Sequence, residues 1–145
     1  MAAELPDLSL FTFSHRLRVR WAEADMQGVV FNGHYLTFFD IGITEYLRAA
    51  FANDPEAMAP LYASLYVAQS SLNFRASARF DDLIDVRVRT AHLGNSSMKI
   101  EFAITRDDEL LVDGVSIYVY APDTTPARVP DAVREALTKV DTAAS

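Results

Sequence analysis

The order of apolar and polar residues predicts a strand followed by a long helix. Residues 11–21 alternate between the two kinds, which is typical of a half-buried strand. From residue 33 apolar residues recur every three or four positions, which indicates a helix with Asn32 as its N-cap and Gly33 just inside it. The strand's inward set is Phe11, Phe13, His15, Leu17, Val19 and Trp21, and the helix stripe is Leu36, Phe39, Ile43, Leu47 and Ala50. Because Phe38, Ile41 and Tyr46 lie outside this stripe, we expect the rest of the protein to wrap the helix.

Most of the remaining chain alternates with a period of two, as strands do. Residues 53–60 contain two prolines and are expected to form at most a short helical turn. Strands are predicted at residues 65–76, 83–93, 98–106 and 110–121, with turns at 94–97 and 106–109 and a bulge at Gly114. Residues 130–140 predict a short amphipathic helix that begins at Pro130 and Asp131.

This order of elements predicts one α+β domain that spans residues 1–145. The short turns between the later strands favour a five-stranded antiparallel sheet, with the long helix covering one face. The alternation places Tyr118 and Tyr120 among the charged residues of the other face. Such a mixture suits a sheet that is partly covered by another subunit.

Composition narrows the function classes. The formal net charge is -7, which argues against general affinity for nucleic acid or for anionic membranes. The chain has no cysteine, which excludes disulfides and thiolate catalysis and suits a cytoplasmic protein. The first residues do not resemble a signal peptide, and no apolar run is long enough to insert into a membrane. Histidine and acidic residues do not occur at metal-ligand spacing, so we expect neither a metal nor another cofactor.

The segment "EADMQGVVFNGHY", residues 23–35, places an acid, a tight turn and a helix start close together. The N-terminus of a helix has unpaired N–H groups that can polarise a carbonyl oxygen. A carboxylate that folds back toward that point, here Asp25, can act as a general base or as a nucleophile. The chain would have to turn near Gly28, where a positive φ or a close backbone approach is expected. An acid before a helix is, however, more often a cap or a solvated loop residue.

This segment resembles the signature of the 4-hydroxybenzoyl-CoA thioesterase family, whose members are hotdog-fold acyl-CoA thioesterases. The matching positions are Arg20, Trp21, Glu23, Asp25, Gly28, Val29, Val30, Asn32 and Tyr35. The resemblance continues through residues 74–90, where Arg79, Phe80, Asp82 and Leu83 match, and through residues 94–104 and 113–137. It departs from the family at the first acid, which is usually Asp and here is Glu23. It also departs at Asn32, where some branches carry a histidine.

The resemblance implies a long helix inside a curved sheet, subunits paired edge to edge as a homodimer or homotetramer, and active sites at the dimer interface. It implies that Asp25 is the catalytic acid. It gives no catalytic role to His34, which is otherwise a tempting acid or base beside the helix start. Together with the chemistry above, it predicts that backbone amides near Asn32 and Gly33 hold the thioester carbonyl.

Substrate contacts are assigned on the same basis. We expect Val30, Phe31, Tyr35 and Phe74 to line the acyl pocket. Arg75 and Arg79 are candidates for the phosphates of CoA, because arginine pairs well with phosphate. An ion pair with Asp81 or Asp82, or simple solvation, explains these two residues equally well. Ser96 and Ser97 are candidates for contact with CoA, although a turn is sufficient to explain them.

The sequence therefore predicts an acyl-CoA thioesterase that hydrolyses an acyl- or aroyl-CoA to the free acid and CoA. Two other functions remain open. One is a hydrolase of acyl-carrier-protein thioesters, which the acidic composition disfavours because carrier proteins are acidic too. The other is a non-catalytic hotdog scaffold that binds acyl-CoA or a protein partner.

Overall fold

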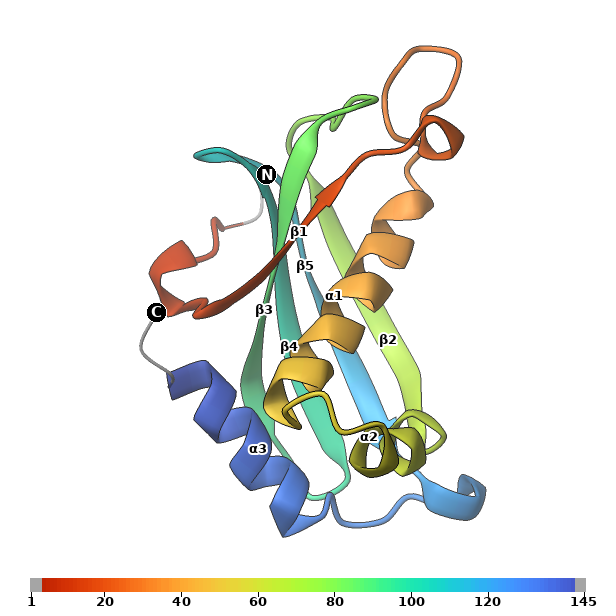
Figure 1. The fold of residues 1–145 in the computed structure, drawn as a ribbon, viewed down its shortest axis with the longest axis vertical. Helices are drawn as coiled ribbons and strands as arrows, with labels where there is room; N and C mark the ends of the chain where they lie inside the picture. The colour runs from red at the N-terminus through yellow and green to blue at the C-terminus, as the bar shows by residue number, and fades with distance from the viewer. Residues whose placement is uncertain (1–3, 143–145) are drawn as a thin grey trace.

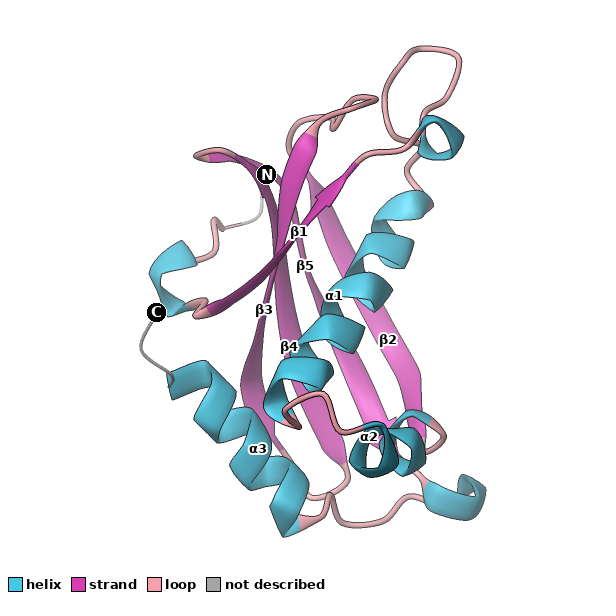
Figure 2. Ribbon diagram, viewed as in Figure 1, coloured by secondary structure: helices cyan, strands magenta, loops and turns pink. Residues whose placement is uncertain are grey.

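A long helix lies across one face of a five-stranded antiparallel sheet (Figures 1 and 2). The computed structural model describes residues 4–142. The strands are β1 (Phe13–Arg18), β2 (Leu65–Phe74), β3 (Leu83–Leu93), β4 (Ser97–Arg106) and β5 (Glu109–Tyr120), and the α-helices are α1 (His34–Ala50), α2 (Pro55–Tyr62) and α3 (Asp131–Thr142). Three short 3₁₀ helices, η1 (Leu8–Leu10), η2 (Trp21–Glu23) and η3 (Pro122–Thr124), complete the order. The α+β class and the five strands are as predicted.

The strands are ordered β1-β3-β4-β5-β2, and every neighbouring pair is antiparallel. The three later strands follow one another through short turns, so they occupy the centre of the sheet. The two strands that flank the long helix in sequence, β1 and β2, form the edges. The segment between β1 and α1 therefore emerges at one end of the sheet, where it meets the connection between β2 and β3 (Figure 1).

The core lies between α1 and the sheet. Phe39 stacks on Phe102 of β4 with the ring centroids 4.3 Å apart. Gly42 faces Val86 of β3, where a Cβ atom would overlap the valine side chain, so glycine allows the helix to approach the strand. Gly114 plays the same part on β5, because a Cβ there would overlap Phe39 and the Ser71 carbonyl oxygen. The predicted bulge at Gly114 is wrong: its pairing is regular, and its function is close packing.

The C-terminal helix α3 is anchored to the core by a partly buried group of hydrogen bonds. The hydroxyl of Tyr46 donates to Asp141 Oδ1 at 2.7 Å and lies 2.8 Å from the hydroxyl of Thr90 on β3. Asp141 Oδ2 accepts the backbone N–H of Thr90 at 3.1 Å. Burial raises the pKa values of both Tyr46 and Asp141. Packing of α3 against α1 and β3 extends the core to Leu137.

The buried stripe of α1 is rotated relative to the predicted one. Its members are Tyr35, Phe38, Phe39, Gly42, Ile43, Tyr46 and Leu47, whereas Leu36 is exposed. The helix begins at His34 with Gly33 as N-cap, so the prediction of Asn32 as N-cap is wrong, and no side chain caps this end. Phe38 and Tyr46, which periodicity placed off the stripe, belong to the core. The helix is less enclosed than expected, because Leu36, Thr37 and Asp40 on its other side are exposed.

Three other expectations need correction. Tyr118 pairs with Met98 and is buried in the core on the helix side, so it does not mark an exposed outer face. Residues 55–62 form a complete helix, α2, because Asp54 caps it and Pro55 occupies its first turn. Trp21 does not continue the strand, because β1 ends at Arg18 and Trp21 begins η2.

Candidate active site

The predicted acid lies on a short hairpin between β1 and α1. Asp25 N donates to the Val29 carbonyl oxygen at 2.8 Å, and Gly28 N donates to the Asp25 carbonyl oxygen at 3.0 Å. Asp25 Oδ1 accepts the backbone N–H of Gln27 at 2.8 Å, as Asp commonly does in a turn. Gly28 has φ +78°, the left-handed conformation that glycine adopts without strain. Local turn chemistry therefore fixes the backbone that carries Asp25.

The carboxylate of Asp25 is exposed and only partly engaged. Its Oδ1 atom is held by the turn, while Oδ2 has no hydrogen-bond partner among residues 4–142. One oxygen is therefore available to a substrate or a water molecule, and the hydrogen bond to Gln27 fixes the direction in which the carboxylate points. Such an acid can serve both the turn and a reaction.

Glu23, the first acid of the segment, is buried with an exposed fraction of 3%. Its Oε1 accepts the backbone N–H of Arg20 at 2.7 Å, and its Oε2 accepts the guanidinium Nε of Arg20 at 2.9 Å. Burial raises the pKa of Glu23, but the hydrogen bonds from Arg20 and the charges of Arg20 and His34 outweigh it, so the pKa lies below its ordinary value. Glu23 is thus an ionised structural residue that closes η2.

The start of α1 presents free backbone donors. Phe31 N donates to the Glu23 carbonyl oxygen at 3.1 Å, and His34 N donates to the Phe31 carbonyl oxygen at 2.9 Å. Within the described part of the chain, the N–H groups of Asn32 and Gly33 have no hydrogen-bond acceptor. These two amides lie at the positive end of the helix, where a carbonyl oxygen or an oxyanion is stabilised.

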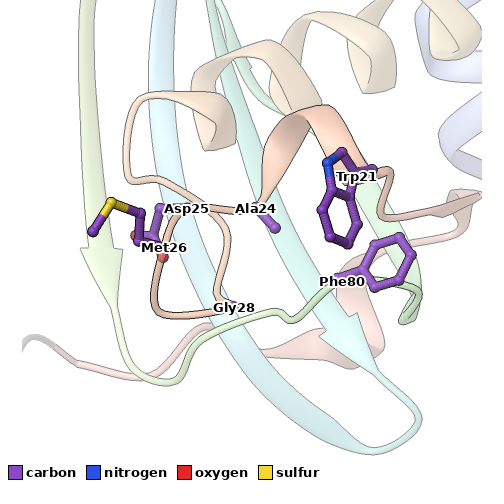
Figure 3. Close-up of a pocket in the computed structure, with 6 residues that line it drawn as sticks. All are labelled: Trp21, Ala24, Asp25, Met26, Gly28 and Phe80. Carbon is purple, nitrogen blue, oxygen red and sulfur yellow. The ribbon is translucent and has the colours of Figure 1, made fainter.

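A pocket of about 680 Å³ opens beside the hairpin (Figure 3). Its lining residues are Trp21, Ala24, Asp25, Met26, Gly28 and Phe80. Figure 3 shows Asp25 and Met26 toward one side, and Trp21 and Phe80 together on the other. The pocket thus brings together the predicted acid and its turn glycine, but its lining does not include Asn32 or Gly33.

Trp21, Met26 and Phe80 were not predicted as site residues. Alternation had assigned Trp21 to the inward face of a strand, whereas the indole is 78% exposed. The available signal was the family resemblance, because Trp21 and Phe80 are both among its matching positions although no role in the site was attached to them.

The residues expected to line the acyl pocket fall into two groups. Val30 and Tyr35 are buried in the core, where the Tyr35 hydroxyl accepts the backbone N–H of Ala78 at 3.0 Å. Burial raises the pKa of Tyr35. Phe31 and Phe74 are exposed, and the Phe74 ring makes an edge contact with Tyr35 at 5.7 Å between centroids.

The four candidate CoA contacts are dispersed. The guanidinium of Arg75 pairs with Asp113 of β5 and also donates to the Glu4 carbonyl oxygen. Arg79 is exposed and forms no ion pair with any residue the structure describes. Ser96 and Ser97 lie at the turn between β3 and β4, at the opposite end of these strands from the hairpin (Figure 1). A single subunit therefore brings only Arg79 near the Asp25 pocket, through the bridge between Val29 and Arg79.

Residues 4–142 contain no group of three histidine, aspartate or glutamate side chains placed to hold a metal ion. None of the described helices is long and apolar enough to cross a membrane.

The fold and the hairpin define a hotdog-fold protein, in which a central helix is wrapped by a five-stranded antiparallel sheet. The model of the Thioesterase superfamily matches residues 27–112, more than half of the chain, and the protein belongs to this family. The match begins two residues after Asp25.

Curated relatives are similar over most of their length. The chain is 26% identical over 99 residues to the acyl-CoA thioesterase YbgC of Haemophilus influenzae, covering 68% of this chain and 73% of the relative. It is 24% identical over 111 residues to the acyl-CoA thioester hydrolase YbgC of Escherichia coli, covering 77% and 82%.

A solved thioesterase from Thermus thermophilus, complexed with coenzyme A and zinc, superposes with a TM-score of 0.79. It is 25% identical, and the superposition covers 93% of this chain and 98% of that protein. A second Thermus thermophilus protein, TT1821, superposes with a TM-score of 0.78 at 27% identity, covering 88% and 98%. These similarities confirm the predicted family and the hotdog fold.

Proposed function

We propose that the protein hydrolyses acyl-CoA or aroyl-CoA thioesters to the free acid and CoA. Family membership and the acyl-CoA thioester hydrolases among its relatives support this reaction class. The observation that carries the proposal is an exposed carboxylate, Asp25, held by its turn with one oxygen unpaired, on the hairpin that leads directly into a helix start with two free amides.

In this mechanism the N–H groups of Asn32 and Gly33 donate to the thioester carbonyl oxygen. That interaction strengthens as negative charge develops on the oxygen in the transition state. Asp25 either removes a proton from a water molecule that attacks the carbonyl carbon, or attacks that carbon itself, and CoA leaves as the thiolate. On the second route the acyl group is left on Asp25 as a mixed anhydride, and water then cleaves this anhydride to give the free acid and restore the carboxylate. Phe31 and Phe74 offer exposed apolar surface to the acyl group. Val30 and Tyr35 are buried in the core behind the hairpin and support this surface from within.

The proposed protein is a homodimer, or a homotetramer built from such dimers. The edge strand β2 supports this, because it pairs with β5 on one side and with no strand on the other in the described part of the chain. It is ten residues long, contains neither proline nor lysine, and exposes Tyr66, Val67 and Phe74. Unprotected edges of this kind invite pairing with another strand. Ser96 and Ser97 lie far from Asp25 of their own subunit, so in this proposal they contribute to the Asp25 site of a partner subunit.

Asp25→Asn tests the reaction. Asparagine keeps an oxygen for the Gln27 amide and so preserves the turn, but it can neither accept a proton nor act as a nucleophile. Loss of a general base commonly lowers turnover by about 10²–10⁴-fold. The measurement is kcat over short, long and aromatic acyl-CoAs, with the melting temperature as a check on folding. Turnover within about tenfold of the wild type would exclude Asp25 as the catalytic acid.

The same screen distinguishes the other functions. Activity on acyl-carrier-protein thioesters alone would indicate the carrier-protein hydrolase. Binding of acyl-CoA without turnover of any thioester would indicate the scaffold.

A further inference from the structure

An exposed aromatic pair stands beside the proposed catalytic acid and has no part in the reaction above. The rings of Trp21 and Phe80 meet edge to face, with centroids 5.2 Å apart and planes at 86° (Figure 3). Both are large apolar side chains that the rest of the chain leaves open to solvent, at 78% and 45% exposure. Exposed aromatic groups that lie together in a pocket are typical of a binding surface rather than of a core.

Hydrogen bonds hold both segments that carry the aromatic pair. Trp21 opens η2, which the buried Glu23 closes through its hydrogen bonds to Arg20. Phe80 belongs to the connection between β2 and β3. Two backbone hydrogen bonds connect it to the end of β1. Asp81 N donates to the Val19 carbonyl oxygen at 3.0 Å, and Val19 N donates to the Asp82 carbonyl oxygen at 2.8 Å. Two segments distant in the sequence thus hold the two rings in a fixed arrangement, which lowers the entropic cost of binding a ligand.

An arginine directly precedes each of the two aromatic residues, although the protein as a whole is acidic. Arg20 precedes Trp21, and its charge is balanced by Glu23. Arg79 precedes Phe80, is exposed, and has no ion-pair partner among residues 4–142. An anion that approaches this acidic protein would meet an unbalanced positive charge next to the aromatic pair.

We propose that Trp21 and Phe80 form a platform for the adenine ring of CoA, with Arg79 facing its phosphates. The inference rests on the proposed function, because it requires a CoA thioester at Asp25. A flat base stacks on one of two perpendicular rings, and the more exposed ring is Trp21, so the adenine stacks on Trp21 while Phe80 packs against Trp21 and holds it in place. Arginine pairs well with phosphate. Between the platform and Asp25 the pocket is lined by Ala24 and Gly28, and a Cβ at Gly28 would meet no atom within 4 Å. The pantetheine arm crosses this open part of the pocket.

The adenine end of the substrate fits this platform better than the acyl end does. The acyl group already has apolar surface of its own at Phe31 and Phe74, and neither of these residues lines the pocket beside Trp21 and Phe80. The nucleotide is the end of the substrate that carries the phosphates, and the exposed residue that directly precedes Phe80 in the chain is the arginine Arg79.

The first experiment compares two substrates that share one acyl group: the CoA thioester, and the N-acetylcysteamine thioester, which lacks the nucleotide. Stacking of a base is worth about 1–3 kcal/mol, so Trp21→Ala is expected to raise KM for the CoA thioester roughly 5- to 150-fold. The kcat/KM for the truncated thioester is expected to stay unchanged. Trp21→Phe, which keeps an aromatic face, should recover most of the loss. Equal damage to both substrates would overturn the proposal in favour of an acyl or purely structural role.

The second experiment needs no catalysis. Trp21 is the only tryptophan of the chain, so intrinsic tryptophan fluorescence reports on the platform alone. The adenosine bisphosphate portion of CoA is expected to quench it, and pantetheine is not. Arg79→Ala should weaken this quenching, whereas Arg128→Ala, an exposed arginine before α3, should leave it unchanged.

The outcomes separate this inference from the proposed function. Hydrolysis of acyl-CoA without quenching by the nucleotide would overturn the platform alone. Quenching without hydrolysis of any thioester would support the platform and overturn the thioesterase. Protection of Trp21 from acrylamide in the ligand-free protein would show that a second copy of the chain covers the rings, and would also overturn the platform.

Discussion

The buried carboxylate of Glu23 binds both the backbone N–H and the guanidinium of the residue three positions earlier, Arg20. The two acids of the segment are therefore different in kind. Glu23 is enclosed and saturated with hydrogen bonds, whereas Asp25, two residues later, is exposed and has an unpaired oxygen. The first holds the loop in place and the second is available for chemistry.

Glu23→Gln is expected to lower stability more than it lowers turnover. The amide keeps one oxygen for the backbone N–H of Arg20, but it turns its NH₂ group toward the guanidinium donors, which leaves polar groups unsatisfied at a cost of about 1–3 kcal/mol. Because the guanidinium is largely exposed and water can reach its donors, the loss is expected at the low end of this range. Thermal unfolding gives the stability, and kcat should fall much less than in Asp25→Asn. A fall in kcat as deep as that of Asp25→Asn would contradict this division of roles.

The stability difference between wild type and Glu23→Gln should depend on pH. The folded-state pKa of Glu23 is lowered, so its contribution is fully present above the ordinary pKa and is lost as pH falls through the lowered value. The two proteins should therefore differ in melting temperature at neutral pH and converge in acid. A difference that persists unchanged in acid would mean that ionisation of Glu23 is not its source.

Gly28→Val is expected to damage folding and activity through backbone strain. Glycine adopts φ +78° freely, whereas a β-branched residue there costs roughly 1–3 kcal/mol. A Cβ at this position would meet no atom of the described residues within 4 Å, so the strain comes from the backbone conformation and not from overlap of the Cβ. A shift of about 1 Å in Asp25 would add on the order of 10²-fold loss of rate. Gly28→Asn is the matched control, because asparagine tolerates this conformation, and it should retain most stability and turnover. Equal effects of the two substitutions would argue against strain as the cause.

Periodicity predicted the architecture because it reports which residues meet the core. The boundaries of β3 agree with the predicted range, and β4 and β5 each begin one residue earlier than predicted. Periodicity failed where neighbouring elements decide the outcome. Periodicity does not distinguish Leu36 from Tyr35, because both are apolar. Tyr35 is the one that is buried, and its hydroxyl accepts the N–H of Ala78, which lies 43 residues further along the chain.

The bulge between Val67 and Gln69 in β2 moves Val67 to the face that carries Ser70 and Leu72, a change that simple alternation cannot predict. For the site, the motif placed Asp25 and Gly28 on the turn, because turn chemistry is local. The pairing of Trp21 with Phe80 depends on two loops that meet only in the folded protein.

Tyr46→Phe is expected to destabilise the protein by about 1–3 kcal/mol, since it leaves Asp141 and Thr90 without the shared hydroxyl in a buried position. The loss should appear in the melting temperature and in faster hydrogen exchange of α3. Tyr62→Phe removes an exposed hydroxyl that donates to the Thr44 carbonyl oxygen, and provides the control. A loss from Tyr62→Phe as large as that from Tyr46→Phe would mean that burial of the Tyr46 group is not what matters.

Charge on the β2 edge is expected to separate the subunits. Tyr66 and Val67 are neighbouring exposed residues of this edge strand, and lysine on an edge strand opposes strand pairing. The double variant Tyr66→Lys/Val67→Lys should keep the fold, because both side chains are already exposed. It should have a single-subunit mass by light scattering at micromolar concentration, where the wild type has the mass of a dimer or tetramer. Leu10→Lys, at an exposed site in η1, is the control and should leave the assembly intact.

If the site is shared between subunits, turnover should fall together with the dimer. A wild-type protein with the mass of one subunit would refute both the pairing and the shared site, whereas a monomeric variant with full activity would refute only the shared site.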